Sequence, residues 1–202
     1  MPRDKTISHI KIMTAAKAEF LEMGFEKASM RRIGERCQMT AAAIYRHCRD
    51  KEDLFYQLVS PAEEKLMNWA YAHMQRYEEP VKKRRKMVWQ DSFIDMMREV
   101  IYPDMEDYHL LIAKSKGSKY ENFLHDMTEM AQDKFLAYLE ELRASGISAP
   151  EMTAQQLHLL LTAYLTALFE PVVHNYPRKE AEEALVTLEK FFLPGWKKLM
   201  GV

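Results

Sequence analysis

Hydroxyl groups, cations and one imidazole gather within twelve residues, around three consecutive alanines. Thr40 and Tyr45 carry hydroxyls, Arg46 and Lys51 carry positive charges, and His47 carries an imidazole. Such groups bind phosphate oxygens and the edges of bases, and the alanines between them leave a slim face that lets a backbone come close to a duplex. These residue types therefore favour a surface that lies against double-stranded DNA.

Two short helices joined by a tight turn must position these groups. Ser29 is placed to cap a helix over Met30–Cys37, because its hydroxyl can accept a hydrogen bond from an amide of the first turn. Gln38 and Met39 form the turn, and Thr40 caps a second helix that we expect over Ala41–His47. In a helix-turn-helix unit, the second helix enters the major groove. Short helical pairs with caps and scattered arginines also occur in proteins that bind no DNA, so the spacing alone leaves both interpretations open.

The rest of the chain also predicts helices with short connections. A helix from about Ser8 to Met23 should precede the pair and end at Gly24, and a long helix from Lys51 to about Tyr77 should follow it. Apolar residues at helical spacing continue to the last helix, expected over Arg178–Met200, and the strongest capping signal is Thr153 with Gln156. The fold class is therefore all-α.

Positive charge is concentrated at the start of the chain, although the whole chain has a formal net charge of −1. Residues 1–52 hold 11 Lys and Arg against 7 Asp and Glu, whereas the remaining 150 residues hold 18 against 23. This asymmetry is expected when only the first segment approaches phosphate. Four charges can also arise by chance, so the signal is supporting rather than decisive.

A specific pattern of aromatic, small and basic residues runs through residues 15–59. It comprises a Phe before a Gly-aromatic pair, a hydroxyl cap, an Ile-Gly pair, a second cap, and an aliphatic-Tyr pair followed by basic residues. Its positions are Phe20, Gly24-Phe25, Ser29, Ile33-Gly34, Thr40, Ile44-Tyr45, Arg46-His47, Lys51-Glu52 and Leu54-Phe55. By these residues the segment resembles the DNA-binding domain of TetR-family transcriptional regulators. The resemblance covers about a quarter of the chain, and the rest matches the family only in helical character and length.

The resemblance implies which residues touch DNA. Phosphate contacts would come from Ser29, Thr40, Tyr45 and Lys51, and groove contacts from Arg31, Ala41, Ala42 and His47. Because the alanines offer no donors, base reading would depend on thymine methyl contacts, on Arg46 and His47, and on a minor-groove arm at Arg3 and Lys5. A solvated terminus is the plainer interpretation of that arm.

Four positions depart from the family pattern. Gln38 replaces the turn glycine, so either the turn adopts a conformation that a side chain tolerates or Gln38 accepts a positive φ. Ala41 stands where a polar or basic residue is usual, and Ala42 where glycine is usual. Cys48 replaces a phenylalanine and leaves a smaller local core.

The resemblance also implies a two-part chain, with a helix-turn-helix DNA-binding domain over residues 1–52 and a helical ligand-binding and dimerisation domain over residues 53–202. A small-molecule effector, lipophilic or aromatic, would bind among the middle helices, where Met and aromatic residues are frequent. Most of these side chains must be core, and those we expect at the pocket are Trp69, Trp89, Phe93, Met96, Met97, Tyr108, Phe123 and Met127.

A homodimer through the last two helices is implied as well. Leucines and aromatics occupy more than one side of these helices, which also fits a helix buried in the centre of a monomer. The residues concerned are Leu159, Leu161, Tyr164, Leu168, Leu185, Leu188 and Phe192.

An all-helical metal-dependent enzyme is the alternative from another class. Glu106 and His109 have the i, i+3 spacing of ligands in di-iron bundles, but a second Glu-x-x-His does not occur. Phosphate-binding loops and nucleophile motifs are also absent from the sequence. We therefore expect no cofactor, no metal and no catalysis.

Two cysteines, Cys37 and Cys48, cannot make a disulfide framework, which favours a reducing compartment. No apolar signal segment opens the chain. The most apolar stretch, Leu157 to Val173, is 17 residues long with His158, Glu170 and Pro171, and we expect it to be too short and too polar to span a membrane. Together these features predict a cytoplasmic protein.

Overall fold

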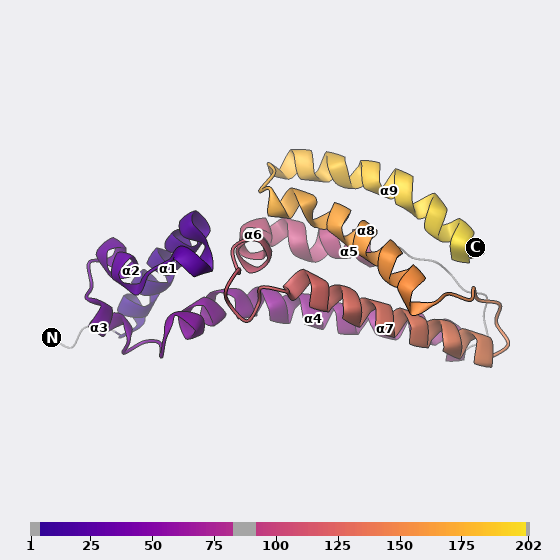
Figure 1. Ribbon diagram of the computed structural model, residues 1–202, viewed down its shortest axis with the longest axis horizontal. Coiled ribbons are helices and arrows are strands. Elements are labelled where there is room, and N and C mark those ends of the chain that lie inside the picture. The colour runs from indigo at the N-terminus through magenta and orange to yellow at the C-terminus, as the bar shows by residue number, and fades with distance from the viewer. Residues whose placement is uncertain (1–4, 83–91, 201–202) are drawn as a thin grey trace. The chain divides into compact units, whose positions relative to one another are not determined.

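The computed structural model describes residues 5–82 and 92–200, and this part of the chain is built from helices and contains no strand (Figure 1). The predicted all-α fold class is confirmed. Trp89 and Arg3 lie outside the described residues, as does the side chain of Lys5.

Four helices form the first part of the chain. They are α1 (Lys5–Lys27), α2 (Met30–Cys37), α3 (Ala41–Ile44) and α4 (Lys51–Lys82). The helix expected to end at Gly24 is interrupted there, because Gly24 has φ 72° and ψ 161°. Asp50 caps α4 as its position suggests, with its Oδ1 accepting from the Asp53 backbone N–H at 2.7 Å.

The middle of the chain is less regular than a continuous helix. It comprises α5 (Ser92–Met96), a π-helical turn η1 (Met97–Ile101), a 3-10 turn η2 (Tyr102–Asp104) and α6 (Met105–Ala113). Pro103 explains part of this irregularity, since proline donates no backbone hydrogen bond to continue a helix. Wider π-helical turns interrupt helices at functional sites more often than elsewhere.

Three long helices complete the chain, namely α7 (Phe123–Ala144), α8 (Ala154–Val173) and α9 (Arg178–Met200). The capping box is present as expected, with Gln156 N donating to Thr153 Oγ1 at 3.2 Å and Thr153 N donating to Gln156 Oε1 at 2.9 Å. Helix α8 packs against both α7 and α9 (Figure 1). Its buried side chains include Leu161, Tyr164 and Leu168.

Contacts divide the chain into two compact units. The first contains residues up to Glu64 together with Glu106–Asn122, and the second contains Lys65–Met105 and the residues from Phe123 onward. This is a division by packing rather than by function, so the boundary expected between residues 52 and 53 stays a prediction.

Aromatic packing forms the centre of the first unit. The Phe20 and Phe55 rings meet edge to face with centroids 5.0 Å apart, and the Phe25 ring lies 5.2 Å from that of Phe55. Edge-to-face contacts of this kind stabilise a core beyond simple burial. Because Phe20 and Phe25 come from α1 and Phe55 from α4, this cluster fixes the two helices that flank α2 and α3.

Helix α8 corrects one expectation. It has 20 residues and a mean hydropathy of 1.3 over its most apolar window, so it is long and apolar enough to span a membrane, and the length argument made from the sequence was wrong. Within the second unit α8 packs against α7 and α9, with Leu157, Leu165 and Phe169 also buried.

Candidate nucleic-acid interface

The turn between α2 and α3 takes a left-handed conformation at Gln38, with φ 57° and ψ 41°. The Gln38 N–H donates to the Glu35 carbonyl at 3.3 Å, and the Met39 N–H donates to the Gly34 carbonyl at 2.8 Å. This pair of hydrogen bonds is the Schellman arrangement that ends many helices, usually with glycine at the left-handed position. Of the two conformations that the sequence left open, Gln38 has the positive φ.

Gly34 is required by the close approach of the same turn. A Cβ atom added at Gly34 would lie 2.5 Å from the Met39 carbonyl oxygen, which belongs to the backbone and has little freedom to move. Glycine at this position therefore lets the turn fold tightly against α2 and sets the angle at which α3 leaves it.

Helix α3 is shorter than the sequence indicated. Thr40 caps it as expected, with its Oγ1 accepting from the Ala43 N–H at 3.2 Å, but the α-helix ends at Ile44 rather than at His47. The Arg46 N–H bonds to the Ala43 carbonyl at 3.3 Å and the His47 N–H bonds to the Ile44 carbonyl at 2.7 Å. These i→i+3 bonds tighten the end of the helix into a turn, as is common at helix termini.

One face of this segment is buried and the opposite face is open. Ala43 and Ile44 lie in the core, whereas Thr40, Ala42, Tyr45 and Arg46 are exposed, Tyr45 by 50%. Ala41 and His47 lie at the edge of the open face and are half-buried. A half-exposed tyrosine on a helix this short provides a hydroxyl that solvent or a ligand can reach.

Arg31 is the most exposed cation of α2. Its side chain is 80% exposed and forms an ion pair with Glu35, one turn further along α2, at 3.1 Å. A pair this exposed contributes little to stability and can exchange for another partner. Arg31 therefore remains accessible to an anion.

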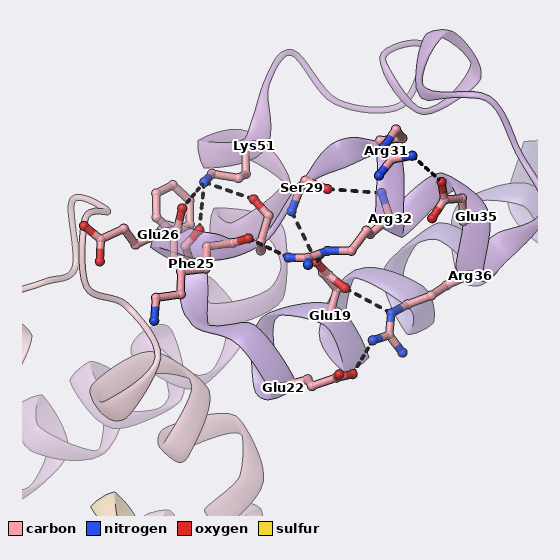
Figure 2. Close-up of polar contacts among 12 residues, drawn as sticks. Glu19, Glu22, Phe25, Glu26, Ser29, Arg31, Arg32, Glu35, Arg36 and Lys51 are labelled. Atoms are coloured by element: carbon pink, nitrogen blue, oxygen red, sulfur yellow. Dashed lines mark hydrogen bonds and ion pairs between the residues drawn. The ribbon is translucent and has the colours of Figure 1, made fainter.

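Ser29 lies at the edge of an ion network that the sequence analysis did not identify. Its Oγ accepts from the Arg32 N–H at 3.2 Å, and its own N–H donates to Glu19 Oε1 at 3.3 Å. The Glu19 side chain is fully buried and also accepts from Arg32 Nε at 2.7 Å and Arg36 Nε at 3.1 Å (Figure 2). A carboxylate from α1 thus fixes two arginines of α2.

The spacing of Glu19 contained a signal for this role. Glu19 is seven residues after Ile12 and three after Ala16, and both of these residues are fully buried on the inner stripe of α1. An acidic residue on a buried stripe needs cationic partners, because an unpaired buried carboxylate is costly. Arg36 also pairs with Glu22, and the carboxylates of Glu22 and Glu19 raise the pKa of its guanidinium.

Lys51 makes its contacts within the protein. Its Nζ donates to the carbonyl oxygens of Phe25 at 2.7 Å and of Glu26 and Ala28 at 3.3 Å each (Figure 2). Burial lowers the pKa of this ammonium. The three N–H donors of Lys51 are therefore directed at the end of α1, and a phosphate contact from Lys51 stays a prediction.

Comparison with known proteins identifies this segment. Residues 12–58 match the model of the bacterial regulatory proteins of the tetR family. A helix-turn-helix (HTH)-type transcriptional repressor of Mycobacterium tuberculosis is 36% identical over 56 residues, which are 28% of this chain and 30% of that protein. The likeness to the TetR family in sequence therefore lies in residues 12–58.

Solved structures extend the likeness in fold to nearly the whole chain. A TetR-like transcriptional regulator from Rhodococcus has a TM-score of 0.58 at 14% identity and covers 97% of both chains. TetR-family or related regulators from Thermus thermophilus and Aquifex aeolicus have TM-scores of 0.55 and 0.54 at 17% and 20% identity. The Thermus thermophilus match covers 88% of this chain and 94% of that regulator. The Aquifex aeolicus match covers 92% of this chain and 97% of that regulator. At these identities the likeness shows the fold, whereas the curated relative matches less than a third of its own length.

The residues expected at an effector pocket are divided between the two packing units. Tyr108 lies in the first unit, fully buried, with its hydroxyl donating to the Ala62 carbonyl at 2.9 Å. Six others lie in the second unit, where Met96, Met97 and Met127 are buried and Trp69, Phe93 and Phe123 are partly buried. Tyr108 thus belongs to a different packing unit from the other six residues, and the pocket assignment stays a prediction.

Trp69 and Phe93 have polar or aromatic partners within the second unit. The Trp69 indole donates to Glu99 at 2.8 Å, and the Phe93 ring lies edge to face with Tyr164 at 5.8 Å. Tyr164 in turn packs against Phe192 at 4.8 Å and Trp196 at 5.9 Å. The sequence analysis treated Tyr164 and Phe192 as dimer contacts, but Tyr164 is fully buried within the chain.

Glu106, a residue of the metal-enzyme alternative, has another partner. Lys17 Nζ lies 2.7 Å from the Glu106 carboxylate and 2.6 Å from the Asp107 carboxylate. These two ion pairs join the start of α6 to α1. Burial by itself would lower the pKa of Lys17, but hydrogen bonds to Asp107 and Glu106 raise it. His109 is buried, and among residues 5–82 and 92–200 no group of three or more His, Cys, Asp or Glu could hold a metal ion.

Proposed function

We propose that this chain is a TetR-family DNA-binding transcriptional repressor whose open face on α3 lies in the major groove. The observation that carries this proposal is the exposure of Thr40, Ala42, Tyr45 and Arg46 on one side of a segment whose other side is core. The match of residues 12–58 to the family and the repressor function of the curated relative support it.

Different groups have different tasks in this interface. The hydroxyls of Thr40 and Tyr45 bind phosphates, and the slim surface at Ala41 and Ala42 lets the helix come close to thymine methyls. Arg31, Arg46 and His47 supply the donors that the alanines lack. The Ser29 hydroxyl can donate to a phosphate while it accepts from the Arg32 amide, whereas Lys51 binds phosphate only if DNA draws its ammonium away from the end of α1.

A homodimer through α8 and α9 would place two such faces on one duplex. Exposed apolar side chains on these helices support it, among them Phe191 at 75% and Leu159 at 70%, with Leu160, Val186 and Leu199 also exposed. Apart from Leu159, these are not the residues selected from the sequence, since Leu161, Tyr164, Leu168 and Leu185 are buried within the chain. Two α3 faces, one from each protomer and about 34–36 Å apart, would enter successive major grooves of a pseudo-palindromic operator.

Control by a small molecule is the second part of the proposal. An effector bound in the second unit would change the spacing of the two α3 faces if it bound the dimer with one spacing more tightly than the dimer with the other. The backbone passes directly from the second unit to the first at this point, because Met105 belongs to the second unit and Glu106 to the first. Glu106 also forms an ion pair with Lys17 of α1. The Met and aromatic side chains near Phe93 favour a lipophilic or aromatic effector.

Neither a catalytic role nor a membrane location is part of this proposal. Lys17 engages the Glu106 carboxylate that the metal-enzyme alternative requires, and no observation favours that alternative. We expect the protein to work in the cytoplasm, where its operator lies.

Selection of bound fragments from a random duplex pool tests the function. We expect an inverted repeat to be enriched, and we expect binding to the enriched duplex to weaken as salt rises, because bound cations displace counterions from DNA. Recovery of no common sequence together with salt-independent retention would reject the proposal.

The dimer has a separate test in sedimentation of the purified protein. Phe191→Glu places a charge on the exposed apolar face of α9 and should shift the protein toward monomer. Tyr71→Glu, at a 62% exposed tyrosine of α4, is the matched control and should leave the mass of the assembly unchanged. A Phe191→Glu protein of unchanged mass would exclude this face as the interface.

A further inference from the structure

His9 of α1 and His47 lie ring against ring, at the edge of the open face of α3. Their centroids are 6.1 Å apart and the ring planes differ by 30°. Both side chains are half-buried. The sequence analysis assigned His47 to the groove and gave no role to His9.

The two rings continue the contact between α1 and α3 from the core to the surface. His9 precedes the fully buried Ile12 by three residues on α1, and His47 follows the fully buried Ile44 by three residues. The His47 backbone is held as well, because its N–H donates to the Ile44 carbonyl at 2.7 Å. With its backbone held and its ring stacked against that of His9, the His47 imidazole has fewer orientations than it would have alone.

We infer that His9 is a positioning residue for base recognition, which acts by fixing the ring of His47 at the major groove. This inference rests on the proposed function. A base contact depends on the direction of the donor, so a ring that turns freely loses discrimination between base pairs while overall attraction to the duplex persists. Stacking against His9 supplies this constraint without His9 having to touch a base.

The test is a double-mutant cycle read as base preference on the duplex that the wild-type protein selects. His47→Ala should reduce discrimination at one base pair of each half-site by about 5- to 150-fold, the range for a good base contact. His9→Ala should reduce discrimination at the same base pair by about 2- to 10-fold, the range for an aromatic stacking contact. His9→Phe, which keeps a flat ring, should stay close to the wild-type protein.

Coupling separates positioning from two independent contacts. If His9 acts through His47, then His9→Ala adds nothing to His47→Ala, whereas independent effects would multiply. The salt dependence of binding should be the same in His9→Ala and the wild-type protein, because His9 binds no phosphate in this account. His125→Ala, an exposed histidine of α7, is the control and should change neither property.

Three results would overturn the inference: unchanged base preference in His9→Ala, multiplicative effects in the double variant, or a weaker salt dependence in His9→Ala. If His9→Ala does not fold at the assay temperature, His9→Gln, which also lacks a ring, gives the same readouts. Failure of the proposed function is distinguishable, because the wild-type protein would then select no sequence at all.

Discussion

The ammonium of Lys51 lies 4.3 Å from the centroid of the Phe25 ring and 2.7 Å from the Phe25 carbonyl oxygen. One cation at the start of α4 thus binds both the ring and the backbone of a residue that follows the kink at Gly24. Carbonyls at the end of a helix have no partner within the helix, and a lysine that reaches them stabilises that end. Lys51 therefore joins α1 to α4 inside the first unit.

Replacing Lys51 with methionine should lower the stability of the protein. Lys51→Met keeps the apolar stem and removes the donors to three carbonyls, so we expect a loss of about 1–2 kcal/mol in the free energy of unfolding. Chemical denaturation followed by circular dichroism measures it. Lys116→Met, at an exposed lysine with only a 3.8 Å pair to Glu26, is the control and should stay within about 0.5 kcal/mol of wild type. Equal stability of both variants would contradict the structural role of Lys51.

The turn at Gln38 offers a stabilising substitution. Gln38→Gly should raise the free energy of unfolding by about 0.5–1 kcal/mol, because a glycine adopts φ 57° without the steric cost that a side chain incurs. Gly34→Ala should do the opposite, since its Cβ would meet the Met39 carbonyl oxygen at 2.5 Å. Thermal unfolding of the two variants measures both effects. A destabilised Gln38→Gly protein would show that the Gln38 side chain contributes more than its backbone costs.

The buried carboxylate of Glu19 should be costly to neutralise. Glu19→Gln keeps the shape of the side chain but leaves Arg32 and Arg36 without their shared anion. Because both arginines are partly exposed and can turn to water, we expect a loss of about 1–3 kcal/mol rather than the full cost of an orphaned buried charge. Glu35→Gln, whose partner Arg31 is largely exposed, should change stability by less than about 0.5 kcal/mol. Denaturant unfolding of the two variants distinguishes these outcomes.

The two cysteines should differ in reactivity. Burial raises the pKa of the Cys48 thiol to about 11, so at pH 8 almost none of it is thiolate, whereas Cys37 is partly exposed. A thiol reagent should label Cys37 first and Cys48 only as the protein unfolds. Since the unfolded chain releases the Cys48 proton near pH 9.0, ahead of the folded protein, this group lowers stability as pH rises from about 9 to 11. Equal labelling of both thiols in the folded protein would contradict the burial of Cys48.

Local chemistry explains how far the sequence predicted the fold. Caps at Ser29, Thr40 and Thr153 act within three residues of their partners, and the sequence located all three. The end of α3 was misplaced because i→i+3 bonding after Ile44 depends on packing rather than on residue type.

The candidate site was predictable in its exposed residues and less so in its supports. The exposure of Tyr45 and Arg46 follows from helical spacing opposite Ala43 and Ile44. The contacts of Lys51 with the end of α1 span 23 to 26 residues of sequence, and those of Arg32 and Arg36 with Glu19 span 13 and 17, so no local pattern predicts them.

The central claim, that the open face of α3 lies against DNA, is tested most directly by the affinity of an Ala42→Glu protein for the selected duplex. Ala42 is exposed, so a glutamate there leaves the core intact while placing negative charge and bulk where DNA would lie. The account predicts at least about a 30-fold loss of affinity at an unchanged unfolding temperature, with Ala137→Glu, at an exposed alanine of α7, binding as wild type. An Ala42→Glu protein that binds the duplex as tightly as wild type would contradict it.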